Sequence, residues 1–298
     1  MAGGGIMLQT AVAHEGRPVS AGLAVVVARE IPHRARQSVL IAIPAIDDNY
    51  FWLQHDGRDA LVVDPGVAAP VQAALDAHGL ALRAILVTHH HPDHIGGVAE
   101  LARRHRPRII GPLEPRIGGL TEVVGDGAGV ALDGPAVAFT VLAVPGHTAT
   151  HVAFHGDQRL YVGDTLFSLG CGRLFEGSPA QMLDSLDRIA ALPPATEVCC
   201  AHEYTLANAA FALTVEPGNP ALQARVAQAR AQRAAGQPTL PMRLGEEREC
   251  NPFLRVDVPA VRARVAEGGG DADSRVGTFA SLRDWKDRFR PGQATPWT

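Results

Sequence analysis

The hydrophobic pattern between residues 38 and 202 alternates short apolar runs with longer amphipathic stretches. Short apolar runs bounded by turn residues are typical of buried strands. We expect strands at 39–43, 50–53, 60–63, 84–87, 108–110, 138–144, 151–154, 160–162 and 196–200. The amphipathic stretches predict helices at 70–78, 97–105 and 179–191. Ser178 is a suitable N-cap for the last of these, with Pro179 at its first position. Strands interleaved with helices indicate an α/β layered domain.

The pattern changes after residue 202, where helical periodicity replaces the strand pattern. We expect helices at 203–215, 220–235, 260–267 and 274–290, separated by proline- and glycine-rich breaks. A strand signal remains only in a short piece near 251–255. The sequence therefore predicts a separate helical domain over residues 203–298.

The N-terminal segment differs from both regions. The first forty residues contain a glycine triplet, four arginines and only two acidic residues. Their longest apolar run, 23–28, is far too short to span a membrane. The early Glu15 and Arg17 argue against a secretory signal. We expect residues 1–37 to be a poorly ordered extension, with an organelle-targeting segment as the alternative.

Composition narrows the classes of function. The chain has 298 residues, 46% of them hydrophobic, and a net charge of −4, as in an ordinary globular protein. This charge provides no basic footprint for nucleic acid, so we expect neither a nucleic-acid nor a membrane partner. The four cysteines form no C-x-x-C pair. Reduced thiols indicate a reducing compartment, and we expect a cytoplasmic protein.

One heptapeptide, residues 88–94, carries the main chemical signal. It follows the apolar run 84–87 and contains four potential metal ligands: His89, His91, Asp93 and His94. A single histidine after a strand is commonly an ordinary loop or core residue. Four potential ligands within six residues are not expected in an ordinary loop or core. Imidazole and carboxylate ligands together suit zinc, iron or manganese.

Three further candidate ligands also follow predicted strands, namely His147, Asp164 and His202. Loops at strand ends of one layered sheet converge at one edge, so we expect all seven side chains to meet. The number suits two divalent metal ions per chain, zinc foremost, with iron or manganese as alternatives. Asp164 would bridge the ions. Such a site indicates hydrolysis at a polarised carbonyl or phosphoryl centre. Thr88, Asp64 and Thr148 are candidates for orienting the ligands through hydrogen bonds.

The order and spacing of these elements resemble the metallo-β-lactamase superfamily, which implies an αβ/βα sandwich with a dinuclear site. Other segments narrow the resemblance to glyoxalase II, the hydroxyacylglutathione hydrolases. These segments are 44–50 (PAIDDNY), 170–177 (GCGRLFEG), 201–208 (AHEYTLAN), 215–217 (VEP) and 251–255 (NPFLR). The resemblance covers residues 38 to 290. It divides the chain into a metal-binding domain at 38–202 and a helical glutathione-binding domain at 203–298.

The resemblance implies a role for each ligand. One ion would be held by His89, His91 and His147, and the other by Asp93, His94 and His202. Asp93 would also orient the nucleophile. The implied reaction is hydrolysis of S-D-lactoylglutathione to D-lactate and glutathione by a metal-bridged hydroxide, the second step of methylglyoxal detoxification.

Five residues would contact glutathione by the same resemblance: Arg173, Phe175, Tyr204, Arg283 and Lys286. Two of these depart from the family's common pattern, which has lysine at the first position and tyrosine at the second. Arg173 keeps the positive charge. Phe175 keeps a ring but loses a hydroxyl, which could cost about 0.5–1.5 kcal/mol of binding. The expected partner is this small-molecule thioester, and we expect the chain to act as a monomer.

Two other functions remain as alternatives. A persulfide dioxygenase with a single iron needs only two histidines and one aspartate, so the seven candidate ligands favour the hydrolase. A non-catalytic module that binds glutathione conjugates would be favoured if several of the candidate metal ligands were missing. A lactonase or β-lactamase would leave the helical tail with its Tyr204, Arg283 and Lys286 without a role.

Overall fold

The computed structural model describes residues 38–290 of the chain. These residues belong to a single compact unit. The predicted extension at 1–37 lies outside the described residues. Among the described helices, none is long and apolar enough to cross a membrane.

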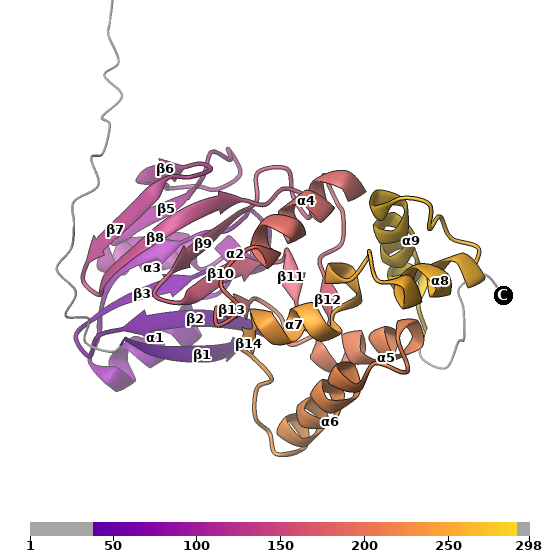
Figure 1. Ribbon diagram of the computed structural model, residues 1–298. Helices are drawn as coiled ribbons and strands as arrows, with labels where there is room; N and C mark the ends of the chain where they lie inside the picture. Colours follow the sequence, from indigo (N-terminus) through magenta and orange to yellow (C-terminus); the bar gives the residue numbers. More distant parts are fainter. Residues whose placement is uncertain (1–37, 291–298) are drawn as a thin grey trace, which may run out of the picture. The chain divides into compact units, whose positions relative to one another are not determined.

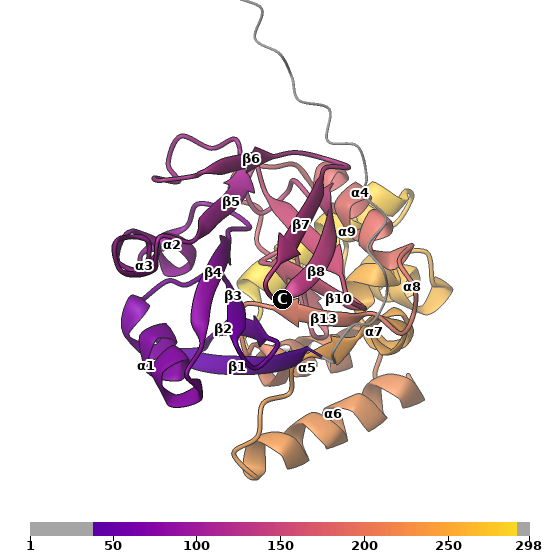
Figure 2. The same ribbon diagram turned by 90° about the vertical axis from the view of Figure 1, so that its left-hand side faces the viewer.

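Two six-stranded sheets form the centre of this unit (Figures 1 and 2). The first has the order β1-β2-β3-β4-β5-β6, antiparallel up to β3 and parallel from β3 to β6. Its strands are β1 (Val39–Ala45), β2 (Asn49–His55), β3 (Asp59–Val63), β4 (Ala81–Leu86), β5 (Arg108–Pro112) and β6 (Glu122–Val124). The second has the order β14-β13-β10-β9-β8-β7. Its strands are β7 (Gly129–Asp133), β8 (Ala136–Ala143), β9 (Val152–Gly156), β10 (Arg159–Gly163), β13 (Glu197–Cys200) and β14 (Met242–Arg243). A small hairpin pairs β11 (Leu166–Phe167) with β12 (Gly170–Cys171).

Side-chain alternation along the strands builds two cores on the two faces of the first sheet. Trp52 and Leu61 belong to the core shared with the second sheet, which also contains Phe139. Their neighbours Leu53 and Val62 instead pack with α1 and α3. These two helices lie on the outer side of the first sheet (Figure 2). The helices of this half are α1 (Ala68–His78), α2 (Pro92–Ile95), α3 (Val98–His105) and α4 (Pro179–Ala190).

Helix α4 covers the second sheet and completes the layers. Met182 and Leu186 of this helix are fully buried in the core between the sheets and α4. Ser178 and Gln181 form a capping box at its start, and Pro179 is its first residue. The predicted α/β class and αβ/βα sandwich are therefore confirmed.

The residues after 203 are mainly helical. The helices are α5 (Thr205–Val215), α6 (Pro220–Ala234), α7 (Leu244–Cys250), α8 (Pro259–Glu267) and α9 (Arg275–Arg288). In Figure 1 they lie beside the sheets, from the lower centre (α6 and α7) to the right (α8 and α9) of the picture. Phe211 of α5 and Trp285 of α9 belong to the same buried cluster as the inner faces of the sheets. The helices and the second sheet therefore share one core.

Every strand expected between 39 and 200 is present, with ends that shift by a few residues. The strand expected near 251–255 is wrong, because Pro252–Leu254 form a 3-10 helix whose start is capped by the Asn251 side chain. The sequence did not predict β14, which lies within the helical region and pairs with β13. Two residues are too few to give an alternating pattern.

Candidate metal centre

The ends of four strands bring the seven candidate ligands together. His89 and His91 follow β4, His147 follows β8, Asp164 follows β10, and His202 follows β13. Short helix α2 carries the remaining two, Asp93 and His94. One cavity of about 510 Å³ is lined by five of the seven: His91, Asp93, His147, Asp164 and His202. His89 and His94 lie fully buried behind it.

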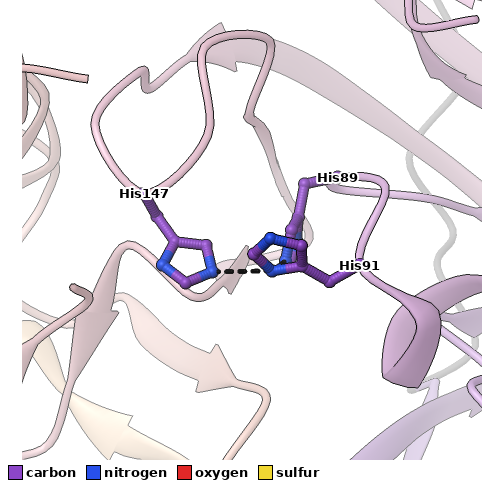
Figure 3. Close-up of side chains that lie close together, drawn as sticks. All are labelled: His89, His91 and His147. Carbon is purple, nitrogen blue, oxygen red and sulfur yellow. Dashed lines mark hydrogen bonds between the residues drawn. The ribbon is translucent and has the colours of Figure 1, made fainter. Parts of the chain in front are cut away.

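Three imidazoles form the first ligand cluster (Figure 3). Nδ1 of His91 lies 3.1 Å from Nε2 of His89 and 3.0 Å from Nε2 of His147. Zinc–nitrogen bonds of about 2.0–2.1 Å at tetrahedral angles place ligand atoms roughly 3.3 Å apart. The three nitrogens thus have the spacing of ligands around one ion.

Asp93, His94 and His202 form the second cluster. Oδ2 of Asp93 lies 3.4 Å from Nε2 of His94 and 3.4 Å from Nε2 of His202. Asp164 lies between the clusters, because its Oδ2 is 3.4 Å from Nε2 of both His147 and His202. One carboxylate therefore contacts both clusters.

A third grouping contains Asp64, His89 and His94. Asp64 is engaged elsewhere, since its carboxylate accepts hydrogen bonds from the backbone and hydroxyl of Thr88 at 2.8 and 2.7 Å. It also lies 3.1 Å from Nδ1 of His94. Asp64 and Thr88 therefore make polar contacts beside the candidate ligands, at the positions where the sequence led us to expect orienting residues. The Thr148 hydroxyl is buried without a hydrogen-bond partner in the described region.

Hydrogen bonds to Nδ1 of His147 and of His202 determine which ring nitrogen faces the ligand clusters. His147 donates from Nδ1 to the carbonyl of Arg173 at 2.9 Å. His202 donates from Nδ1 to Oδ1 of Asp48 at 2.7 Å. Both rings therefore present Nε2 to the cluster, which is how hydrogen bonds to the distal nitrogen orient metal-binding imidazoles. Asn49 similarly holds Oδ2 of Asp93 at 3.0 Å.

Two buried polar atoms show that the clusters fit a pair of cations. Nε2 of His94 and Oδ1 of Asp164 are buried and have no hydrogen-bond partner in the described region. Buried polar atoms in folded proteins nearly always have a partner, and a divalent ion would supply one here. Imidazole and carboxylate are also ligands that such ions take.

Burial and neighbouring charges set the protonation of these groups. Burial lowers the pKa of His89 well below its usual value and that of His91 to about 4, which keeps both imidazoles neutral and able to bind metal. Burial would also lower the pKa of His202, but the adjoining aspartates, led by Asp164, raise it to about 10. Burial would raise the pKa of Asp164, but His94 and His202 hold it well below its usual range.

Five more residues reach the same cavity, and they are the ones expected to contact glutathione: Arg173, Phe175, Tyr204, Arg283 and Lys286. The Tyr204 ring is stacked on His202, with centroids 4.7 Å apart. The Phe175 ring is 62% exposed and lies 5.2 Å from the ring of His147. Aromatic surface therefore adjoins both clusters.

The three cations in the cavity have different surroundings. Arg283 is buried, and its guanidinium donates to the Cys171 carbonyl at 2.7 Å and to Asp287 at 2.8 Å. Arg173 is exposed and lies 3.4 Å from Asp287. Burial, followed by repulsion from Arg283 and Arg173, lowers the pKa of Lys286 to about 8. Arg283 thus has a structural role as well as a place in the cavity wall.

Residues 47–202 match the metallo-beta-lactamase superfamily, and residues 203–289 match the family described as hydroxyacylglutathione hydrolase C-terminus. The hydroxyacylglutathione hydrolase of Cupriavidus taiwanensis is 54% identical over 261 residues, which cover 83% of this chain and 98% of that protein. The hydroxyacylglutathione hydrolase of Xanthomonas euvesicatoria is 55% identical over 255 residues, covering 84% and 99%. The chain belongs to the hydroxyacylglutathione hydrolase family.

Solved structures resemble this hydroxyacylglutathione hydrolase family member in fold. ETHE1 from Myxococcus xanthus is 23% identical with a TM-score of 0.59, covering 85% of this chain and 92% of that one. The B3 metallo-beta-lactamase BLEG-1 is 22% identical with a TM-score of 0.56, covering 72% and 99%. At these identities the likeness shows the fold alone.

Membership in the hydroxyacylglutathione hydrolase family makes the chain an enzyme, a thioester hydrolase. Together with the two clusters, it supports a dinuclear metal site. Neither the single-iron dioxygenase nor the non-catalytic module is favoured. No sequence pattern pointed to Asp48 or Asn49 as orienting residues, although both lie in the 44–50 segment that carried part of the resemblance.

Proposed function

We propose that this enzyme hydrolyses S-D-lactoylglutathione to D-lactate and glutathione at a pair of zinc ions. One observation carries the proposal: two ligand clusters joined by Asp164 share a cavity with Arg173, Arg283 and Lys286. Glutathione has two carboxylates, and these cations are suitable partners for them. Iron and manganese suit the same ligands.

In this proposal His89, His91 and His147 hold one ion, Asp93, His94 and His202 hold the other, and Asp164 bridges them. The interatomic distances of 3.0–3.5 Å within and between the clusters support this division. When bound, the ions would polarise the thioester carbonyl and lower the pKa of water toward about 7.

Asp93 would direct the attacking water. Burial would raise the pKa of this carboxyl, but the neighbouring imidazoles of His202 and His94 lower it, so the group stays ionised. Asn49 holds the carboxylate in one orientation. The departing thiolate needs little protonation, because its conjugate acid has a pKa of about 8.5.

The helical region would supply most of the contacts with glutathione. Burial raises the pKa of the Tyr204 hydroxyl, which therefore stays protonated and can donate a hydrogen bond. Arg283 and Lys286 add positive charge from α9. We accordingly propose a division of labour between a metal-binding domain at 38–202 and a glutathione-binding domain at 203–298. The proposal includes a monomeric chain in the cytoplasm with this small molecule as its partner.

A truncated substrate tests recognition of glutathione. We expect a D-lactoyl thioester of a small uncharged thiol to have a kcat/KM lower by about 10²-fold or more, because binding of remote charged groups contributes to catalysis. The measurement is steady-state thioester loss with both substrates on one preparation. Equal kcat/KM values would instead indicate a general thioesterase and contradict the proposal.

Lys286 gives the proposal a pH signature. Its ammonium is charged below the pKa of about 8 and neutral above it, so attraction for a substrate carboxylate is lost as pH rises through that value. We expect kcat/KM, which reports the free enzyme, to fall on the alkaline side. Lys286→Arg should remove this fall, since arginine stays charged. A fall that persists unchanged in Lys286→Arg would assign it to another group.

A further inference from the structure

His90 is the one histidine of residues 89–91 that neither ligand cluster uses. Its side chain is only 9% exposed and lies between two carboxylates. Nδ1 is 3.9 Å from Oε2 of Glu114, and Nε2 is 3.6 Å from Oε1 of Glu176. These carboxylates come from distant parts of the chain, so their meeting beside the metal ligands calls for an explanation.

Arg116 joins the two carboxylates. Its Nε and Nη2 donate to the two oxygens of Glu114 at 2.7 and 2.8 Å, and its Nη1 donates to Glu176 at 2.7 Å. We call Glu114, Arg116 and Glu176 the carboxylate bracket. The Arg116 hydrogen bonds are the main cause that lowers the pKa of Glu114 to about 2, and they also lower the pKa of Glu176. The bracket is therefore charged at neutral pH.

The bracket connects the loops on either side of the first ligand cluster. Glu114 accepts from the Thr150 hydroxyl at 2.9 Å, and Glu176 accepts from the Ala149 backbone at 2.8 Å. Both donors belong to the loop that carries His147. Glu176 itself belongs to the segment 172–177, which carries Arg173 and Phe175 into the cavity.

Backbone bonds fasten the same two loops together. Phe175 donates its N–H to the carbonyl of His147 at 3.2 Å, and Gly177 donates to that of Gly146 at 3.0 Å. The backbones approach so closely that a Cβ on Gly177 would lie 2.6 Å from Cα of Gly146. The position of segment 172–177 thus depends on the His147 loop. Among the described residues, the Arg116–Glu176 pair is the only ion pair between this segment and residues 114–116.

We propose that the carboxylate bracket positions segment 172–177 for substrate binding, so that Arg173 and Phe175 meet the glutathione part of the thioester. The inference rests on the proposed function for its substrate. Glu114, Arg116 and Glu176 are positioning residues here, because none of them lines the substrate cavity. Glu114 has a side chain only 3% exposed, so loss of its arginine would leave a buried charge without its main partner.

The test compares Arg116→Met with Arg116→Lys and with a surface control. We expect Arg116→Met to raise KM for S-D-lactoylglutathione by about tenfold, since one charge-assisted contact changes an equilibrium by roughly that factor. The kcat and metal content should stay within about twofold. Arg116→Lys should recover part of KM, because lysine keeps the charge but cannot form the bidentate pair. The control is Arg108→Met, which removes an exposed ion pair with Glu122 and should change neither constant.

Hydrogen exchange provides a readout that does not need the substrate. The amides of Phe175 and Gly177 should exchange faster in Arg116→Met than in the parent chain or in Arg108→Met. Parent-like exchange and KM in Arg116→Met would overturn the proposal. A fall in kcat and metal content with unchanged KM would also overturn it. That result would mean that the bracket supports the position of His147 and not that of segment 172–177.

Two further measurements distinguish failure of this proposal from failure of the proposed function or of folding. If the parent enzyme fails to cleave S-D-lactoylglutathione, the proposed function fails, and the exchange of Phe175 and Gly177 still decides whether the bracket holds the segment. If Arg116→Met does not fold, Glu176→Gln removes the negative charge that pairs with Arg116 and should also raise KM. A parent-like KM in a folded Glu176→Gln would contradict the proposal.

Discussion

An Asp164→Ala variant is expected to lose both turnover and metal. Among the described residues, Asp164 has a carboxylate oxygen 3.4 Å from Nε2 of both His147 and His202, and its removal leaves these two imidazoles without their shared anion. Changing a group that only orients a ligand commonly costs about 10–100-fold, so loss of a bridging ligand should lower kcat by at least about 10²-fold. Metal analysis should give fewer than two ions per chain.

The control for this variant is Asp133→Ala, which removes an exposed carboxylate at the end of β7. We expect it to keep the parent's metal content and kcat. An Asp164→Ala enzyme that retained both ions and full turnover would refute the bridging role. A comparison of thermal unfolding without added metal would show that the loss does not reflect a failure to fold.

The second large effect is expected from Asp48→Ala, although Asp48 would touch no metal. Its carboxylate accepts the Nδ1 proton of His202 at 2.7 Å and so leaves Nε2 facing the second cluster. Without this acceptor the ring can rotate or present the wrong nitrogen. We expect affinity for the second metal ion to fall by about 10–100-fold. Titration of the metal-depleted protein with zinc would measure it.

Asp47→Ala is a closely matched control for Asp48→Ala. The two residues are adjacent and carry the same charge, but Asp47 is exposed and its side chain forms no hydrogen bond or ion pair within residues 38–290. Loss of one negative charge near the site should therefore change metal affinity only slightly. If both variants weakened metal binding equally, the effect would come from charge, and the orienting role of Asp48 would be wrong.

The sequence predicted those parts of the site that depend on local pattern. His89, His147, Asp164 and His202 each follow an apolar strand, and strand ends of one sandwich meet at an edge. The structure adds contacts between residues far apart in the chain. Asp48 and His202 are separated by 154 positions, and no local period links them.

Sequence patterns also could not predict that one side chain has both a structural contact and a place in the cavity wall. Arg283 and Lys286 are three positions apart in one helix, a spacing that places them on the same face, and both line the cavity. That spacing could not show that Arg283 is also bonded to the Cys171 carbonyl, because the contact joins α9 to the β11–β12 hairpin. The carboxylate bracket was missed for the same reason, since Glu114 and Glu176 lie on loops that meet only in the folded chain.

The most direct test of the account is metal content and turnover measured on the same purified sample. Thioester loss from S-D-lactoylglutathione would be followed beside an oxygen electrode supplied with glutathione persulfide. Two ions per chain, rapid thioester loss and no oxygen uptake are the predicted result. One iron per chain, with oxygen uptake and little thioester loss, would contradict the account and indicate a dioxygenase.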